Sequence, residues 1–206
     1  GSFEVLKLTG FDLKGKTLGV VGVGRIGRHI VKMAKGFEMR VLGFNISVDE
    51  ELASRLGFSY VNLETLLKES DIVSLHVPYT KETHHLIGEK ELGVIKPGAY
   101  LINTSRGGVV DTMALAKALE GGRLGGAALD VLEEEGLVKD ELEFLSKGRS
   151  EEHNLKTILA NHVLIDMPNV LITPHNAFNT KEALERILLT TATNINAFIT
   201  GNAQNT

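Results

Sequence analysis

A glycine-rich turn is the first feature of the sequence that could do chemistry. Gly22, Gly24 and Gly27 follow the first predicted strand, residues 16–21, and precede a stretch with helical periodicity. Gly22 would permit a tight turn, Gly24 would let the backbone approach a ligand, and Gly27 would let the helix pack closely on the strand. The start of a helix also offers unpaired amides and a positive dipole. The turn therefore predicts a site for anionic phosphate, as in a nucleotide cofactor.

Glycine also serves in turns for backbone reasons alone, so this triplet by itself leaves other nucleotide cofactors possible. Asn45 ends the second apolar run, eighteen positions after Gly27. NAD-binding units of this kind usually carry Asp or Glu there, which hydrogen-bonds the adenosine ribose. An amide can still bond to ribose, but it lacks the charge that repels the extra phosphate of NADP. We therefore expect weak discrimination between the two cofactors, although no Arg follows that would favour NADP.

The elements that must position this turn alternate along the chain. Short apolar runs without polar alternation predict strands buried on both faces, at residues 17–23, 40–44, 72–77, 99–103, 125–131 and 170–173. Helical patterns lie between or after them, at residues 26–35, 50–56, 63–69, 112–120, 155–160 and 181–199. Asn62, Asp111 and Thr180 are suitable helix N-caps. We predict an α/β fold with a doubly wound, Rossmann-like parallel sheet.

Composition narrows the class of protein. The 206 residues are 43% hydrophobic and 23% charged, which is ordinary for a folded globular domain. The net charge of -4 and the dispersed basic residues argue against nucleic acid as a partner. No apolar run is long enough to cross a membrane and no signal peptide is evident, so we expect a soluble protein. The absence of Cys excludes disulfides and fits the reducing cytoplasm.

Two segments stand apart from the alternating pattern. Gly1 and Ser2 look like a cloning scar, so we exclude them from the reasoning on the fold. Residues 133–162 are charged and weakly apolar, which predicts a helical insertion between two strands. With no internal repeat and no linker rich in Pro or Ser, residues 3–206 are expected to form one domain.

Four further motifs follow the glycine turn in a fixed order. They are HVPYTKET at residues 76–83, KPGAYLINTSRGGVVD at 96–111, AALDVLEEE at 127–135 and TPHNA at 173–177. With these motifs, the chain from about residue 11 to residue 202 resembles the D-isomer-specific 2-hydroxyacid dehydrogenases, and most closely their D-lactate members. The resemblance implies a nicotinamide-dinucleotide-binding domain that takes part in hydride transfer between NAD and a D-2-hydroxy acid, with D-lactate and pyruvate favoured.

The resemblance implies a catalytic set of His175, Arg106 and Glu135. His175 would exchange a proton with the substrate oxygen, as acid in keto-acid reduction and as base in the reverse direction. Glu135 would favour the charged imidazole and fix its orientation. Arg106 offers a planar guanidinium that suits a substrate carboxylate. Taken singly, each has a simpler explanation: a strand-end His, a loop Arg and a solvated acidic run.

The same resemblance implies the cofactor contacts. Besides the three glycines, these are the amides of Arg25 and Ile26 for the pyrophosphate, Asn45 for the ribose, Val77 and Pro78 for the adenosine side, Asp130 near the nicotinamide, and Thr83, Thr104, Ser105 and Arg106 as further contacts. Gly136 departs from the family, where Pro often follows the catalytic Glu.

The remaining histidines do not suggest a metal site. His84, His85, His153 and His162 lack the paired ligand spacing of a zinc site and a fitting carboxylate pattern. We therefore interpret them as surface or packing residues, and we predict no metal.

The resemblance also implies what lies beyond this chain. The family has a second, substrate-binding domain, built mainly from an N-terminal segment that this sequence does not contain. Because a closing cleft excludes water and completes the site, we expect the chain to bind NAD(H) but to turn over keto acids slowly. Family members commonly dimerise through this domain, near the helix after the glycine turn, which predicts a homodimer.

Two other functions compete with an enzyme fragment. The chain could be an NAD(H)-responsive regulatory or interaction module, because some proteins of this fold regulate partners instead of metabolising acids. It could also be a transferase that uses another nucleotide cofactor on a similar sheet. The presence of His175, Arg106 and Glu135 in order favours the dehydrogenase over both.

Overall fold

The computed structural model describes residues 9–135 and 155–202 of the chain. They fall into two compact units, Gly1–Ile172 and Thr173–Thr206, and each unit is described by itself. The first unit contains every strand of the described residues, and the second contains one long helix. The presumed scar at Gly1 and Ser2 lies outside the described residues. That residues 3–206 form one domain stays a prediction.

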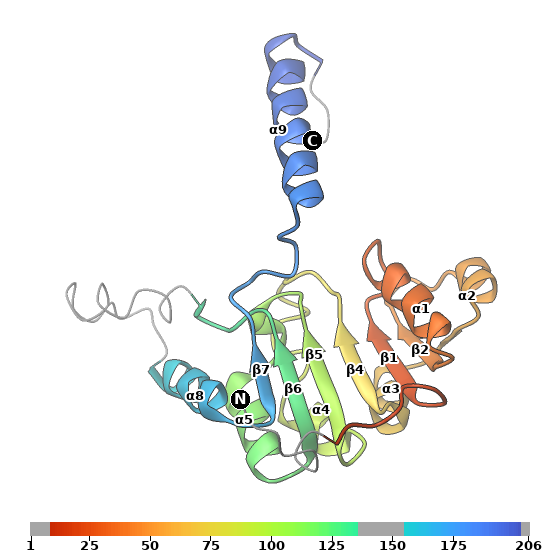
Figure 1. The fold of residues 1–206 in the computed structure, drawn as a ribbon, viewed down its shortest axis with the longest axis vertical. Coiled ribbons are helices and arrows are strands. Elements are labelled where there is room, and N and C mark those ends of the chain that lie inside the picture. Colours follow the sequence, from red (N-terminus) through yellow and green to blue (C-terminus); the bar gives the residue numbers. More distant parts are fainter. Residues whose placement is uncertain (1–8, 136–154, 203–206) are drawn as a thin grey trace. The chain divides into compact units, whose positions relative to one another are not determined.

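The first unit is built on a parallel sheet of seven strands in the order β3-β2-β1-β4-β5-β6-β7 (Figure 1). The strands are β1 (Thr17–Val21), β2 (Arg40–Phe44), β3 (Ser59–Tyr60), β4 (Ile72–Leu75), β5 (Ala99–Asn103), β6 (Leu124–Leu129) and β7 (Val170–Ile172). Every neighbouring pair is parallel, with Val20 opposite both Gly43 and Ser74 in the centre. This confirms the predicted doubly wound sheet.

Helices connect the strands. In the first unit they are α1 (Gly27–Gly36), α2 (Glu50–Leu56), α3 (Leu63–Glu69), α4 (Glu89–Val94), α5 (Thr112–Glu120) and α8 (Leu155–Asp166), with a 3-10 turn at Gly107–Val109. The second unit contains α9 (Lys181–Ile199). The predicted caps are confirmed, because side-chain oxygens of Asn62, Asp111 and Thr180 accept the amides of Thr65, Ala114 and Ala183.

Two apolar clusters lie on the two faces of the sheet. One joins Val31 of α1 and Leu52 of α2 to Val20 and Val41 of the first strands. The other, larger cluster joins α3, α4, α5 and α8 to the strands; its most deeply buried members include Leu66, Leu101, Leu115 and Leu164. Right-handed crossovers place helices on opposite faces when the strand order reverses after β3, which explains this division.

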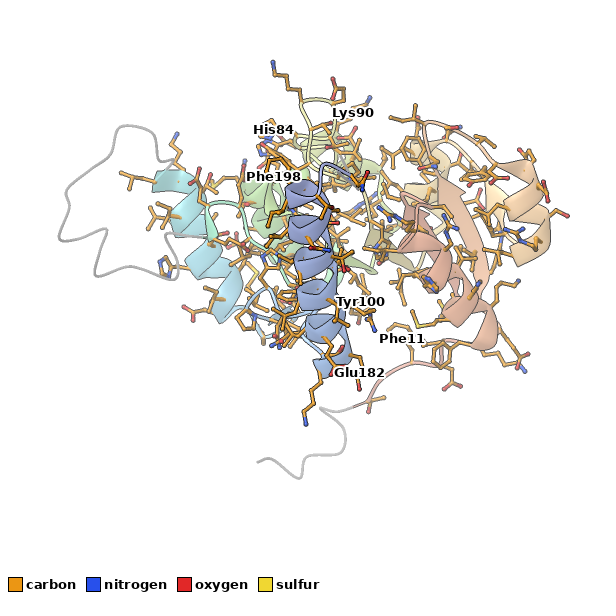
Figure 2. The ribbon with its side chains drawn as sticks, turned by 90° about the horizontal axis from the view of Figure 1, so that it is seen from above. Phe11, His84, Lys90, Tyr100, Glu182 and Phe198 are labelled. Carbon is orange, nitrogen blue, oxygen red and sulfur yellow. The ribbon has the colours of Figure 1, made fainter. Side chains whose placement is uncertain are left out.

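Within the described residues of the first unit, a cleft lies beside β5, β6 and β7 on the face of the sheet opposite α5. Leu101 of β5 points into the larger cluster, so its neighbour Tyr100 points the other way. The Phe11 and Tyr100 rings lie 5.3 Å apart between centroids (Figure 2), and Lys16 stands over Phe11. These two rings line an apolar cleft together with Ile102, Ala128 and Leu171.

The structure corrects the predicted elements in a few places. The two-residue strand β3 and the short helix α4 were not predicted, because neither is long enough to show a periodic pattern. Helix α8 reaches Asp166, beyond the expected insertion at residues 133–162. Most of that insertion, residues 136–154, lies outside the described residues. Among the described helices, none has the length and apolar character needed to cross a membrane.

Candidate functional site

The predicted site residues of the first unit gather at one edge of the sheet. Gly22 follows β1, Asn45 follows β2, Val77 lies just beyond β4, Thr104 follows β5 and Asp130 follows β6. Because all strands are parallel, these carboxyl ends share an edge. The order reverses between β1 and β4, and ligands of such sheets bind in the crevice outside this reversal. The fold thus brings motifs that are far apart in sequence to one binding edge.

The glycine turn has the geometry that the sequence predicts. Gly22 has a φ of +95°, and a Cβ there would lie 2.7 Å from the carbonyl oxygen of His76. A Cβ on Gly27 would lie 2.2 Å from the carbonyl oxygen of Gly22, so the helix approaches the turn closely. A Cβ on Gly24 would meet nothing within 4 Å, which leaves the backbone open to a ligand.

The start of α1 adds the electrostatic part of this site. Ile26 is its N-cap, and no side chain caps the helix. The first backbone bond into the helix runs from the Arg28 amide to Gly24 O (3.1 Å), which leaves the amides of Arg25 and Ile26 at the end of the turn. An uncapped ten-residue helix with an open glycine before it is a suitable cradle for a pyrophosphate.

The adenosine side of the predicted site has a polar rim. Asn45 is half-buried and lies directly after β2. Its Nδ2 donates to Ser47 O at 3.0 Å, and this bond fixes the orientation of the side-chain amide, including its acceptor atom Oδ1. Val77 is half-buried and Pro78 is exposed. Thr83 is nearly buried, and its hydroxyl donates to Pro78 O at 2.6 Å. Thr83 therefore shapes this turn, and its contact with a cofactor stays a prediction.

The loop after β5 is held from within by Asn103. Its Oδ1 accepts both the amide (3.0 Å) and the hydroxyl (2.7 Å) of Ser105, and its Nδ2 donates to Arg106 O at 3.0 Å. Ser105 is buried, whereas Thr104 and Arg106 are exposed. Arg106 Nη1 donates to Ser105 O at 2.7 Å, which leaves the guanidinium at the surface with donors for an anion.

The loop after β6 carries the two predicted carboxylates. Asp130 is 5% exposed, and its amide donates to Asn103 O at 2.9 Å, which joins this loop to the one after β5. Glu135 is half-buried, and one of its carboxylate oxygens accepts the amide of Leu132 at 3.4 Å. A Cβ on Gly107 would lie 2.1 Å from the carbonyl carbon of Leu132. The backbones next to Arg106 and Glu135 are therefore in direct contact.

The third predicted catalytic residue, His175, belongs to the second unit. It is half-buried and has a φ of +53°, and its amide donates to Thr173 O at 2.9 Å. Its ring meets the Phe178 ring edge to face, with centroids 6.4 Å apart. A left-handed backbone at a non-glycine residue is uncommon and concentrates at functional sites. The structure thus brings the loops that carry Arg106 and Glu135 together in the first unit, whereas His175 lies in the second unit.

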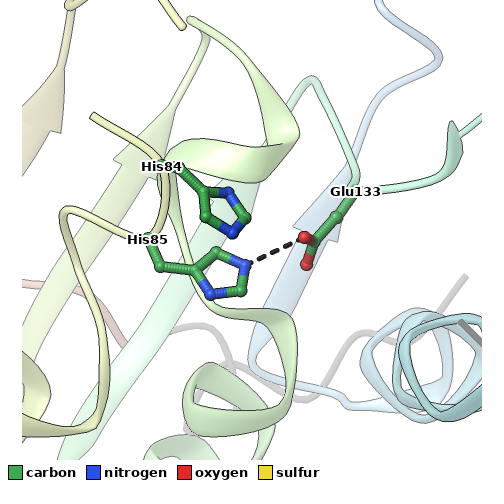
Figure 3. A group of neighbouring side chains, drawn as sticks. All are labelled: His84, His85 and Glu133. Atoms are coloured by element: carbon green, nitrogen blue, oxygen red, sulfur yellow. Dashed lines mark hydrogen bonds and ion pairs between the residues drawn. The ribbon is translucent and has the colours of Figure 1, made fainter. Parts of the chain in front are cut away.

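Sequence reasoning missed a cluster of three side chains in the first unit, which belong to His84, His85 and Glu133. His85 Nε2 and Glu133 Oε1 lie 2.9 Å apart, and the His84 ring stacks on His85 with centroids 3.9 Å apart (Figure 3). Each side chain offers one atom that could be a metal ligand, and these three atoms lie within 4.8 Å of one another. The interpretation that these histidines have no fitting carboxylate is therefore wrong for His85. Its partner is 48 residues away, so only knowledge of adjacent loops could have found the pair.

Two ionisable groups at opposite ends of the strands have perturbed pKa values. Desolvation lowers the pKa of His76, whose Nε2 lies 2.9 Å from the Ser74 hydroxyl, so the neutral ring is favoured. At the other edge, burial by itself would raise the pKa of Asp71, but bonds from Lys96 and the Thr17 amide outweigh it and lower the pKa. Lys96 Nζ lies 2.6 Å from Asp71 Oδ1.

The fold and this binding edge define a dinucleotide-binding domain of the doubly wound class. Residues 2–177 match the D-isomer-specific 2-hydroxyacid dehydrogenase, NAD binding domain family. The chain belongs to this family and is its NAD-binding domain. The expected resemblance is thus confirmed. The open Gly24 and the uncapped start of α1 fit the cofactor that the family name states.

Several proteins of known description are similar to the chain. A glyoxylate reductase from Thermococcus litoralis is 47% identical over 196 residues, which cover 95% of this chain and 53% of that protein. The crystal structure of a D-lactate dehydrogenase from Aquifex aeolicus, complexed with NAD and lactic acid, is 42% identical with a TM-score of 0.85, and the match covers 95% of this chain and 57% of that one. The pyruvate reductase of Chlamydomonas reinhardtii is 34% identical with a TM-score of 0.87, covering 100% of this chain and 60% of that chain. The chain therefore spans little more than half the length of these relatives.

Proposed function

We propose that this chain is the coenzyme half of an NAD-dependent oxidoreductase that transfers a hydride between the nicotinamide and a short D-2-hydroxy acid. The observation that carries the proposal is the meeting of the Arg106 and Glu135 loops at the same sheet edge as the glycine turn. Hydride transfer to a 2-keto acid is favoured by a cofactor site beside a group that binds the substrate carboxylate, and the shared edge of the glycine turn and the Arg106 loop supports this assignment.

In this proposal the catalytic roles divide between three side chains. Arg106 binds the substrate carboxylate through its exposed guanidinium and orients the keto carbon toward the nicotinamide. His175 donates the proton that the keto oxygen needs as the hydride arrives, and it removes that proton in the reverse reaction. Glu135 pairs with the imidazolium and keeps it charged near neutral pH. Bound NADH would supply the hydride, and Asp130 would lie near its nicotinamide end.

The relatives support the proposed substrate class. The similar proteins include a glyoxylate reductase and a D-lactate dehydrogenase, and both names point to small 2-oxo or 2-hydroxy acids. We favour pyruvate and D-lactate. We also propose that the chain forms a homodimer through its NAD-binding domain, which light scattering would test, and that it works in the reducing cytoplasm, since it contains no Cys.

A chimera tests the function. The chain replaces the NAD-binding domain of the Aquifex aeolicus relative, and loss of NADH absorbance is followed with pyruvate and with glyoxylate. We expect turnover of both acids, faster with pyruvate, and only slow turnover by the chain alone. Arg106→Lys should raise KM for the acid, because an ammonium cannot form the bidentate contact. His175→Gln should lower kcat. A folded chimera that binds NADH yet reduces neither acid would contradict the proposal.

A further inference from the structure

His85 ties two loops of the predicted site together. Its backbone amide donates to Gly108 O at 2.8 Å, two residues after Arg106, and Ile87 N donates to Val109 O at 3.1 Å. Its side chain extends to the other loop, where Nε2 lies 2.9 Å from Glu133 Oε1 (Figure 3). One residue therefore contacts the Arg106 loop by its backbone and the Glu135 loop by its imidazole.

Glu133 is in turn held by two more elements. Its second carboxylate oxygen accepts the hydroxyl of Thr112, in the first turn of α5, at 3.0 Å. Its backbone carbonyl accepts Asn161 Nδ2, from α8, at 2.7 Å, and Asn161 is fully buried. The two bonds to the carboxylate are charge-assisted and therefore stronger than the neutral bond from Asn161. Glu133 is thus anchored to the domain at three points.

The anchored residue lies two positions before Glu135 and one after Leu132. Leu132 packs on the backbone of Gly107, and its amide donates to the Glu135 carboxylate. A shift of Glu133 would therefore be passed to Glu135 through the chain, and to the neighbourhood of Arg106 through Leu132 and Gly107.

Backbone strain occurs at both ends of the contact between His85 and Glu133, which we call the bridge. His85 has a φ of +50° and Glu134 a φ of +56°, so left-handed non-glycine residues occur on both sides of it. Such conformations cost free energy and persist only where surrounding contacts determine them. The ring of His85 also has a second carboxylate nearby, with Asp111 Oδ2 3.9 Å from Nδ1. These contacts explain how the strained turn is retained.

We infer that His85 is a positioning residue, which acts through Glu133 to hold the Arg106 loop and the Glu135 loop in one fixed arrangement. The inference rests on the proposed function only because that function gives Arg106 and Glu135, and so the two loops, their catalytic roles. His84 is exposed and stacks on the outside of His85, with Tyr79 OH 3.2 Å from its Nδ1, so it is a matched neighbour outside the bridge.

Hydrogen exchange of the chain, read by mass spectrometry, tests the bridge. His85→Asn is the informative variant, because Asn tolerates positive φ but is too short to reach Glu133. We expect exchange in residues 103–111 and 130–135 to become faster by about tenfold, the loss expected for one charge-assisted bond. Residues 17–36, around the glycine turn, should exchange at the rate of the unmodified chain.

Matched variants separate positioning from general destabilisation. Glu133→Gln keeps one side-chain oxygen that can accept from His85, and its NH2 group can donate to the Thr112 hydroxyl, so it should preserve protection of both loops. Glu133→Ala should behave like His85→Asn. His84→Gln should leave both loops protected. The inference is overturned if His85→Asn leaves the two loops unchanged, if residues 17–36 lose protection equally, or if Glu133→Gln fails to rescue. Failure of the chain to bind NADH would count against the proposed function and not against this bridge.

Discussion

The same added methyl group should lower stability at Gly27 but hardly change it at Gly24. A Cβ on Gly24 meets no atom within 4 Å, so Gly24→Ala should change the free energy of unfolding by no more than about 0.5 kcal/mol. A Cβ on Gly27 would lie 2.2 Å from Gly22 O, far inside contact distance. Because the obstructing atom belongs to the backbone, Gly27→Ala should cost about 1–3 kcal/mol of stability.

Gly24→Ala should nevertheless weaken the binding of the coenzyme. The methyl group would occupy the open space through which the backbone is proposed to approach the pyrophosphate, and it would lengthen the proposed bonds from the amides of Arg25 and Ile26. A hydrogen bond to a charged group contributes about 1.5–3 kcal/mol. Loss of one such bond therefore predicts that NADH affinity falls by roughly tenfold to a hundredfold.

Calorimetric titration with NADH and urea unfolding followed by circular dichroism measure the two quantities on the same protein. Gly93→Ala is the matched control, since Gly93 is exposed in α4, away from the glycine turn, and its Cβ would also meet nothing within 4 Å. That variant should leave NADH affinity unchanged. The reasoning is refuted if Gly24→Ala binds NADH as tightly as the unmodified chain, or if it unfolds as readily as Gly27→Ala.

Three further outcomes are expected. Asn45→Asp should weaken NADPH binding relative to NADH by about tenfold, because a carboxylate repels the 2′-phosphate, and an unchanged ratio in parallel titrations would contradict this. Stability should rise with pH between the lowered pKa of His76 in the folded chain and about 6.5, because the unfolded ring binds more protons in that range. Thermal unfolding at a series of pH values measures this, and the rise of Tm with pH should be shallower for His76→Gln. Asp71→Ala removes the acceptor of both Lys96 and the Thr17 amide and should cost about 1–3 kcal/mol in urea unfolding, whereas Asp12→Ala, a matched change of an Asp, should cost much less.

The amino-acid sequence by itself determined the class of fold and the cofactor turn. Strands buried on both faces carry continuous apolar runs, and caps such as Asn62 and Asp111 act within their own helices, so both are visible locally. The positive φ of Gly22 and the close contact of Gly27 with Gly22 O are also local, because both belong to the turn between β1 and α1, whereas the approach of His76 O to Gly22 depends on the neighbouring strand β4. The short elements β3 and α4 escaped because a few residues show no period.

Only the tertiary structure decided which loops meet. Parallel strands joined by helices place residues such as His85 and Glu133, distant in sequence, on adjacent loops, and no local pattern encodes that distance. Read singly, the run at Glu133 resembles a solvated acidic face, yet its carboxylate is bonded from two elements. Local chemistry specifies each helix, strand and turn, whereas contacts between loops depend on strand order, which arises when the whole sheet assembles.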